Sequence, residues 1–218
     1  MNIFTDFSRS CFIQALWLGS EILCQYLVEH PELIVGKRVL ELGAGIGLCG
    51  LGALHLGASN VLMTDGDSDV LENLRYNVNL NINRANPRAS LISCPQLIWG
   101  RNLDQFEKVN VMLACDCIYM TPSLKPLWET VHQLLEPDGV FIYVNVCASQ
   151  APVESVLETA ISFGFAWTRT VTSQGSVFLF RWKSDGDTPA AISTQCWRFE
   201  SSPGGPVGWS YDPTVGKS

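Results

Sequence analysis

Val39-Leu-Glu-Leu-Gly-Ala-Gly-Ile-Gly47 is the stretch that decides the fold of this chain. It is an apolar run that ends in glycines at positions 43, 45 and 47, and the next apolar run ends at Asp65. Glycine lacks a Cβ, so backbone amides in such a loop can approach a ligand at the start of the following helix. The stretch therefore predicts a strand, a glycine loop and a helix that bind a nucleotide. The alternative is a glycine-rich turn that only lets the strand and the helix pack tightly.

Two classes of cofactor fit this loop. Gly45-Ile-Gly-Leu-Cys-Gly50 matches G-x-G-x-x-G, the dinucleotide fingerprint, and an acidic residue about 20 positions further on suits a ribose in either class. Glu41 precedes the first glycine by two residues and gives E-x-G-x-G-x-G, the pattern of S-adenosylmethionine (SAM) sites in class I methyltransferases. We expect a carboxylate here to favour the ammonium of SAM and to repel a pyrophosphate. An NAD-dependent oxidoreductase is therefore the less favoured alternative.

Composition limits the class of protein and its partners. The chain has 218 residues, of which 47% are hydrophobic and 16% charged, enough for one well-packed domain. Its net charge is −7 and its pI is near 4.9, so no sequence-wide basic surface is expected to attract a phosphate backbone. We expect no nucleic acid partner, and a basic protein or peptide instead. The oligomeric state does not follow from the sequence, and a monomer is favoured.

The cysteines and histidines indicate neither disulfides nor a metal. Eight cysteines are scattered, mostly in apolar segments and without a C-x-x-C pair, so they are expected to be reduced. Three widely spaced histidines without paired carboxylates give no support for a metal site. The N-terminus lacks a charged segment followed by an apolar one, and no run approaches the length of a membrane span. We expect a cytoplasmic or nucleocytoplasmic enzyme with no membrane partner.

Alternating periodicities predict an α/β fold. Apolar residues have helical spacing over 18–30, and the pattern then predicts strands at 37–42, 60–65, 91–92, 109–115 and 140–146. Helices are expected between them, at about 46–57, from 67 onward, at 124–135 and at 153–161. Two last strands, 165–172 and 177–183, are joined by a turn and predict a hairpin. This layout, a mostly parallel sheet with an antiparallel C-terminal hairpin, is typical of the Rossmann-like, seven-stranded class I methyltransferase fold.

Three parts of the chain are expected. Residues 1–36 form an N-terminal lead-in segment and helix, and residues 37–183 form the SAM-dependent methyltransferase domain. Residues 184–218 are rich in proline and glycine, which favours a loose tail that cofactor binding does not need. The aromatic residues of this tail are nevertheless apolar enough to dock on another surface.

Candidate site residues follow the predicted strands, because open α/β sheets bind ligands at the carboxyl ends of their strands. Asp65 is expected to accept the ribose hydroxyls, and the alternative role of helix cap is better filled by Asp67 or Ser68. Trp99, in Leu97-Ile-Trp-Gly100, either flanks an adenine or is a core aromatic, and periodicity alone favours the core. Asp116 and Tyr119 follow an uncharged strand. A carboxylate there is costly to bury without a partner, which favours function over the alternative of a helix cap.

Together these residues resemble the seven-β-strand protein lysine methyltransferases, the group that includes the calmodulin-lysine, valosin-containing-protein and elongation-factor lysine methyltransferases. The resemblance runs from about Trp17 to Lys183. It rests on a Trp before the first helix, E-L-G-A-G-x-G-L at 41–48, Thr64-Asp65, Leu97-Ile-Trp-Gly100 and D-x-x-Y at 116–119. It differs in one detail, because Leu18-Gly19 follow the Trp where the family often has Pro or Asp and a small residue.

The resemblance implies a SAM-dependent transfer of a methyl group to a lysine of a protein substrate. It implies that Asp116 and Tyr119 recognise the lysine, and we treat these two as the catalytic candidates. The expected cofactor-binding residues are Trp17, Glu41, Gly43, Ala44, Gly45, Asp65, Trp99 and Cys115. Another acceptor, such as a protein histidine or a small molecule, stays open, as does a SAM-binding module without catalysis.

Overall fold

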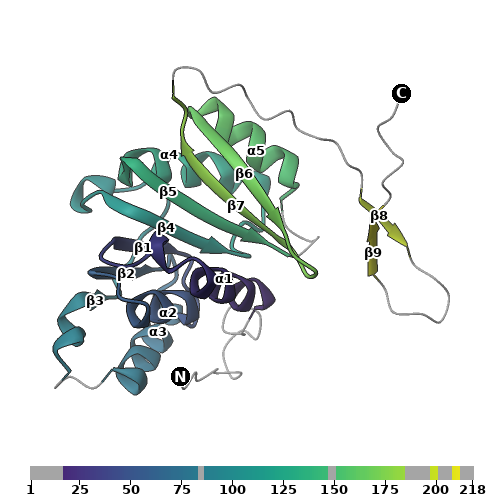
Figure 1. Cartoon of the computed structure of the whole chain (residues 1–218). Helices are drawn as coiled ribbons and strands as arrows, with labels where there is room; N and C mark the ends of the chain where they lie inside the picture. The colour runs from purple at the N-terminus through teal and green to yellow at the C-terminus, as the bar shows by residue number, and fades with distance from the viewer. Residues whose placement is uncertain (1–16, 83–85, 147–150, 185–196, 201–207, 212–218) are drawn as a thin grey trace. The chain divides into compact units, whose positions relative to one another are not determined.

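The computed structural model describes residues 17–82, 86–146 and 151–184, and the backbone of two strands at 197–200 and 208–211. The chain divides into two compact units, Met1–Asp187 and Thr188–Ser218. In the first unit, seven strands form one sheet (Figure 1). They are β1 (Arg38–Leu42), β2 (Asn60–Thr64), β3 (Ile92–Ser93), β4 (Val109–Cys115), β5 (Leu135–Asn145), β6 (Phe165–Val171) and β7 (Ser176–Trp182).

The order of strands in the sheet is β3-β2-β1-β4-β5-β7-β6. The first five strands pair in parallel, β7 pairs antiparallel with β5, and β6 pairs antiparallel with β7. The predicted mostly parallel sheet with an antiparallel C-terminal hairpin is therefore confirmed. The hairpin places β7 inside the sheet and leaves β6 at its edge.

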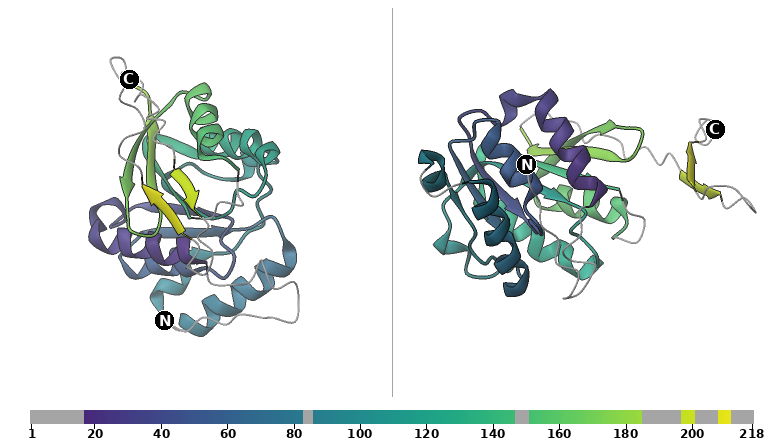
Figure 2. Two further views of the ribbon diagram at one scale, coloured as in Figure 1. Left: turned by 90° about the vertical axis from the view of Figure 1, so that its right-hand side faces the viewer. Right: turned by 90° about the horizontal axis from the view of Figure 1, so that it is seen from below.

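Helices cover both faces of the sheet (Figure 2). The first layer holds α1 (Leu18–Glu29), α2 (Leu48–His55) and α3 (Ser68–Asn81), and the second holds α4 (Leu124–Leu134) and α5 (Val153–Ser162). Four short 3₁₀ helices lie in the connections: η1 (Pro31–Leu33), η2 (Pro87–Leu91), η3 (Leu103–Gln105) and η4 (Thr121–Ser123).

Strand β4 shows why this sheet needs a helix layer on each face. Val111 and Leu113 are buried in the core beneath α1, α2 and α3, whereas Met112 and Ala114 are buried in the core beneath α4 and α5. Successive side chains of a strand point to opposite faces, so a parallel strand covered on both sides has an almost continuous apolar sequence.

Two helix starts have local causes. Gly43, Gly45 and Gly47 have φ angles of 62°, 54° and 87°, a left-handed region that the helix cannot include, so α2 begins after them and two residues later than predicted. At α3 the Asp67 carboxylate accepts hydrogen bonds from the Asp69 and Val70 amides, at 2.8 and 3.5 Å. Asp67 is therefore the N-cap, as the sequence predicts.

Strand β5 begins earlier than expected. The sequence predicts a strand from residue 140, but pairing with β4 already starts at Leu135, and the register shifts between Val109 and Val111. The helix stripe of α4 ends at Leu134, so strand pairing follows the helix directly.

The second unit contains a two-stranded antiparallel ladder, β8 (Trp197–Glu200) with β9 (Gly208–Tyr211). The expectation of a loose tail is therefore wrong for these eight positions. The proline and glycine content on which it was based lies largely between and around the strands. Aromatic residues, which favour strands, occur within them.

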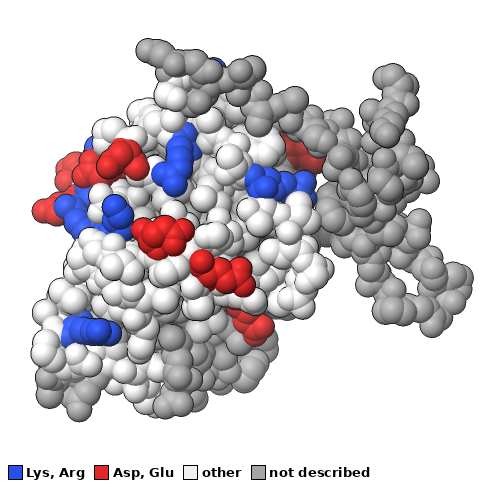
Figure 3. Space-filling model, viewed as in Figure 1, with Lys and Arg blue, Asp and Glu red and all other residues white. Residues whose placement is uncertain are grey.

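Charged side chains of both signs are interspersed over the described part of the face seen in Figure 3. Within the described residues, no helix combines the length and the apolar character that crossing a membrane would need.

Candidate active site

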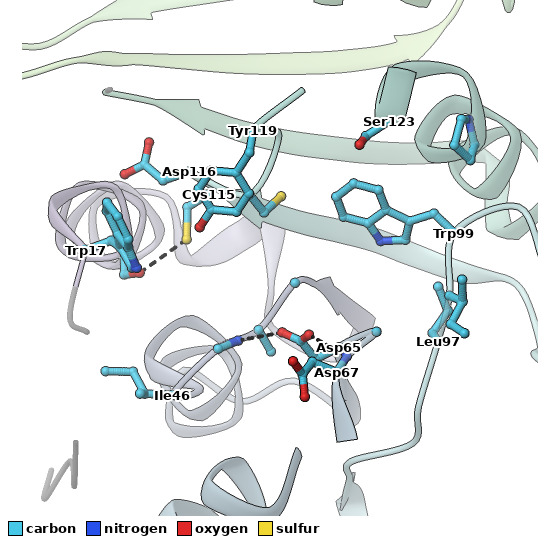
Figure 4. Close-up of a pocket in the computed structure, with 18 residues that line it drawn as sticks. Trp17, Ile46, Asp65, Asp67, Leu97, Trp99, Cys115, Asp116, Tyr119 and Ser123 are labelled. Atoms are coloured by element: carbon cyan, nitrogen blue, oxygen red, sulfur yellow. Dashed lines mark hydrogen bonds between the residues drawn. The ribbon is translucent and has the colours of Figure 1, made fainter. Parts of the chain in front are cut away.

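A cavity of ≈ 410 Å³ lies at the carboxyl ends of the parallel strands. The chain runs from β1 to β2 and β3 on one side, and then returns to β4 on the other side of β1. Ligands of open α/β sheets bind at such a reversal, because the loops on its two sides diverge and leave a crevice. The loops after β1, β2, β3 and β4 and the start of α1 all contribute to the lining (Figure 4).

The glycine loop is held against the end of β2. The Ala44 amide donates to the Thr64 carbonyl at 2.8 Å, and the Gly45 amide donates to Asp65 Oδ2 at 3.2 Å. A Cβ on Gly43 would lie only 2.8 Å from the Cβ of Cys117, so a side chain at this position would collide with the opposite wall. The loop therefore needs glycine for its close approach to β4.

Asp65 is fixed by the loops on both sides of it. Its Oδ1 accepts a hydrogen bond from the Asp67 amide at 3.1 Å, while Oδ2 accepts from Gly45. Burial raises the pKa of Asp65, and hydrogen bonds from the Asp67, Gly45 and Gly66 amides oppose that rise. The structure thus holds an oriented acceptor at the position where the sequence predicts ribose binding.

Trp99 lines the cavity and also packs against the core beneath α4. The Gly100 amide donates to Thr130 Oγ1 at 2.9 Å, which ties the Trp99 loop to that helix. Trp99 therefore packs against the core and also lines the cavity, and its contact with an adenine stays a prediction. Trp17 and Trp99 lie on opposite sides of the cavity (Figure 4).

Trp17 and Tyr119 form an aromatic pair at one end of the cavity. Their ring centroids are 6.4 Å apart and their planes are inclined by 59°. Tyr119 is 50% exposed. Its partial burial, followed by the nearby Cys117 and Asp116, raises the pKa of Tyr119 to about 12. At neutral pH its hydroxyl is therefore a protonated donor.

Asp116 is buried and its carboxylate joins two distant segments. Its Oδ2 accepts from the Gly19 amide in the first turn of α1, and its Oδ1 accepts from the Val146 amide after β5, both at 3.0 Å. Trp17, the N-cap residue of α1, provides no side-chain cap, so Asp116 caps this helix from β4. Asp116 also lines the cavity. Asp116 is thus a helix cap that also lines the cavity, and its role in recognising the acceptor stays a prediction.

Gly19 is required by this cap. A Cβ at position 19 would lie 2.3 Å from Asp116 Oδ2. This contact gives a physical reason for the Leu18-Gly19 sequence after Trp17.

Cys115 lines the cavity between the two tryptophans. Its Sγ lies 3.2 Å from Ser20 Oγ and 3.8 Å from Cys49 Sγ. The hydrogen bond between Ser20 and Cys115 links the first turn of α1 to the end of β4.

Glu41 does not line the cavity, and this corrects the expectation of a contact with the cofactor. Glu41 alternates with Leu40 and Leu42 along β1, so its side chain faces the layer of α2, where Oε2 accepts from the Gly50 amide at 2.9 Å. Burial, only partly offset by this hydrogen bond, raises the pKa of Glu41 to about 8.

The other nine predicted residues all line one cavity. The sequence analysis did not select the remaining lining residues, which are Ser20, Ile46, Gly66, Asp67, Leu97, Ile98, Cys117, Ser123 and Pro126. Most flank a selected motif, so proximity in sequence could have found them. Ser123 and Pro126 have no such signal, because they reach the cavity only through the packing of η4 and α4. Among the described residues, no three His, Cys, Asp or Glu side chains are placed so that they could hold a metal ion together.

The doubly wound sheet, its antiparallel β7 and the cavity at the reversal define a class I methyltransferase fold. One solved structure with this fold is magnesium protoporphyrin IX methyltransferase from Synechocystis with bound SAM. The TM-score is 0.59 at 14% identity, covering 74% of this chain and 77% of that one.

Within that class, the family model described as "Lysine methyltransferase" matches residues 1–155. The chain belongs to this lysine methyltransferase family. It is 35% identical to Protein N-lysine methyltransferase METTL21A of Danio rerio, over 63% of this chain and 62% of that protein. It is 30% identical to Protein N-terminal and lysine N-methyltransferase EFM7 of Cryptococcus neoformans, over 59% of this chain and 45% of that protein. The matched segments thus span less than two thirds of either relative.

Proposed function

We propose that the protein is a SAM-dependent methyltransferase that transfers a methyl group to a lysine side chain of a protein substrate. The observation that carries this proposal is the cavity itself, which brings together the glycine loop, Asp65, Trp99 and the Trp17–Tyr119 pair. Membership of the lysine methyltransferase family supports the same activity.

The size of the cavity and the charge of its lining support SAM as the ligand. A volume of ≈ 410 Å³ is in the range of small-molecule sites. The lining contains three carboxylates, Asp65, Asp67 and Asp116, and no Lys or Arg among the described residues, which suits a cationic ligand. Trp99 offers an aromatic face for an adenine, and Asp65 offers an oriented acceptor for ribose hydroxyls.

When bound, SAM supplies a methyl group on a positively charged sulfur, which a neutral amine attacks in line. The task of the protein is then mainly to hold donor and acceptor close and collinear. The glycine loop, Asp65 and Trp17 hold the donor, while Asp116 and Tyr119 orient the acceptor. No strong acid or base is required for the displacement itself.

A lysine acceptor must lose its proton before it can attack. Lowering a pKa near 10.4 to near 7 corresponds to roughly 4 to 5 kcal/mol. A low dielectric inside the cavity supplies part of this by disfavouring the charged ammonium. Asp116 stabilises the charged amine instead, so its contribution lies in binding and aiming the side chain.

The decisive experiment incubates the protein with radiolabelled SAM and a cell lysate, and then identifies the labelled protein and amino acid. Label on a lysine is the expected result. Label on a histidine would show that the acceptor is histidine rather than lysine, and the protein would still be a methyltransferase. SAM binding without any label in protein or small molecules would favour the non-catalytic module.

We also propose that the protein acts as a cytoplasmic or nucleocytoplasmic monomer on a basic segment of its substrate. The net charge of −7 supports a basic partner. Light scattering coupled to gel filtration tests the monomer, and fractionation of cells expressing the tagged full chain tests the location. A stable dimer or a membrane-bound fraction would contradict these proposals.

A further inference from the structure

Three cysteines meet beside the cavity, although they lie far apart in the sequence. Cys24 belongs to α1, Cys49 to the first turn of α2, and Cys115 ends β4. The sulfurs of Cys49 and Cys115 are 3.8 Å apart. Cys24 Sγ donates to the carbonyl of Leu48, the residue before Cys49, at 3.7 Å. All three thiols are free.

These cysteines differ in access. Cys115 lines the cavity, whereas Cys49 is completely buried behind it. The Ser20 hydroxyl lies 3.2 Å from the Cys115 sulfur. Hydrogen bonds with Cys115 and Cys24, together with burial, raise the pKa of Cys49 and keep it a thiol. A small oxidant that enters the cavity therefore meets Cys115 first.

We propose that Cys115 and Cys49 form a reversible disulfide when hydrogen peroxide enters the cavity without cofactor, and that this disulfide weakens SAM binding. The inference rests on the proposed function, because it assigns redox regulation to the same site. Both cysteines are free thiols in this structure. We infer a disulfide between this pair because their sulfurs are only 3.8 Å apart.

The chemistry balances in two steps. The Cys115 thiolate attacks one oxygen of hydrogen peroxide, the O–O bond breaks, and a sulfenic acid and hydroxide form. The Cys49 sulfur then attacks the Cys115 sulfur, the S–O bond breaks, and the released oxygen leaves as water with the proton of Cys49. In total, two thiols lose two electrons and two protons, and one peroxide becomes two waters.

Closure of the disulfide must change the cavity wall. The two sulfurs have to move from 3.8 Å to the roughly 2.05 Å of a disulfide bond. Cys49 follows the glycine loop by two residues, so a shift of α2 moves the loop, and a turn of Cys115 breaks its contact with Ser20. Both movements alter surfaces that face the cofactor.

The test exposes the reduced full chain to hydrogen peroxide with and without saturating S-adenosylhomocysteine, the demethylated product of SAM. Remaining thiols are alkylated and the cross-linked peptides are mapped by mass spectrometry. We expect a Cys49–Cys115 cross-link that S-adenosylhomocysteine suppresses. Isothermal titration should show S-adenosylhomocysteine binding at least about tenfold weaker after oxidation, and dithiothreitol should restore it.

Two variants sharpen the result. Cys49→Ala removes the buried partner and keeps every side chain of the cavity lining, so peroxide should form no cross-link at Cys115. Cys94→Ala is the matched control, because Cys94 is half-buried and outside the lining, and it should behave like the wild type.

A Cys24–Cys49 cross-link in place of the expected one would overturn the inference. So would a Cys49–Cys115 cross-link that leaves affinity unchanged. Peptide mapping detects the cross-link whether or not the protein binds the cofactor. A protein that never binds S-adenosylhomocysteine would therefore refute the proposed function, and the cross-link would still be tested.

Discussion

Single residues at this site have more than one contact, and Asp116 illustrates the consequence. Its carboxylate caps α1 through Gly19, holds Val146 and faces the cavity. We therefore expect a change at Asp116 to alter cofactor binding through Trp17, as well as contact with the acceptor. The sequence alone predicts an effect on turnover with little effect on SAM affinity, and the cap changes that expectation.

Asp116→Asn keeps one acceptor oxygen and turns an NH₂ group toward a backbone amide. We expect kcat/KM to fall at least about 100-fold, near 2.7 kcal/mol, and SAM affinity to fall as well. Methyl transfer, SAM titration and thermal unfolding on the same preparation measure these effects. Gly19→Ala is the matched control, because it disturbs the same contact and leaves the carboxylate present. Activity near the wild-type level in Asp116→Asn would assign Asp116 to the cap alone.

Asp65→Ala removes the oriented acceptor after β2. SAM affinity should weaken by about 1.5 to 3 kcal/mol, the scale for hydrogen bonds to a charged group. Isothermal titration measures this change. Asp69→Ala, an exposed carboxylate outside the cavity lining, should retain wild-type affinity. Unchanged affinity in a folded Asp65→Ala variant would remove Asp65 from the site.

Glu41→Gln tests the buried carboxyl group in β1. The pKa of Glu41 is about 8 in the folded protein and 4.5 ordinarily. Protonated Glu41 therefore contributes its full stabilisation below pH 4.5, and this stabilisation is lost as the pH rises through 8. The free energy of unfolding of the wild type should therefore fall by a few kcal/mol between these values, at about 1.4 kcal/mol per pKa unit. Glutamine is neutral and still accepts from Gly50, so the variant should lose this dependence. Denaturant unfolding of both proteins across pH 4.5–9 measures this difference. If the free energy of unfolding changed with pH in the same way in both, the pH dependence would not come from Glu41.

Among the elements, the strand–loop–helix unit at β1 and α2 has the strictest requirements. Gly47 is its N-cap, with a φ of 87°, and a Cβ there would lie 2.3 Å from Met63 Cε and 2.4 Å from Leu74 Cδ1. Both the backbone and the space demand glycine. The loop between β1 and α2 is therefore a structural as well as a ligand-facing segment.

Gly47→Ala should lower the free energy of unfolding by more than the roughly 1 to 2 kcal/mol of left-handed backbone strain. Gly36→Ala is the matched control, because Gly36 has a φ of 72° but no atom within 4 Å of its Cβ position. The difference between the two variants in denaturant unfolding measures the collision with Met63 and Leu74. Equal losses would mean that these side chains move aside freely.

For the whole molecule, the first compact unit extends to Asp187 and its sheet ends at Trp182. The paired strands β8 and β9 belong to the second unit. The sequence expectation that cofactor binding does not need residues beyond 183 stays a prediction.

Truncation after Lys183 should leave the fold and SAM affinity unchanged, because all seven strands of the sheet remain. Thermal unfolding and isothermal titration check this. Truncation after Gly175 is the contrasting variant: it removes β7, which lies between β5 and β6, and should abolish folding. Loss of SAM affinity in the longer variant would show that the second unit supports the site.

By itself, the sequence determined the features that depend on neighbouring residues. The alternation of apolar runs gave the order of strands and helices, and the glycine loop, Asp65 and D-x-x-Y located the cavity at the ends of β1, β2 and β4. Such features are predictable because periodicity and glycine conformations are local properties.

The tertiary structure decided which distant groups meet. Asp116 accepts from Gly19 across 97 positions, and Cys49 contacts Cys115 across 66. The glycine motif predicts that Glu41 contacts the cofactor, but its side chain points toward Gly50 instead. The pleat of β1 and the packing of α2, rather than the spacing of the glycines, set this direction. Partners of buried polar groups are fixed by how the elements pack, and no local pattern encodes that packing.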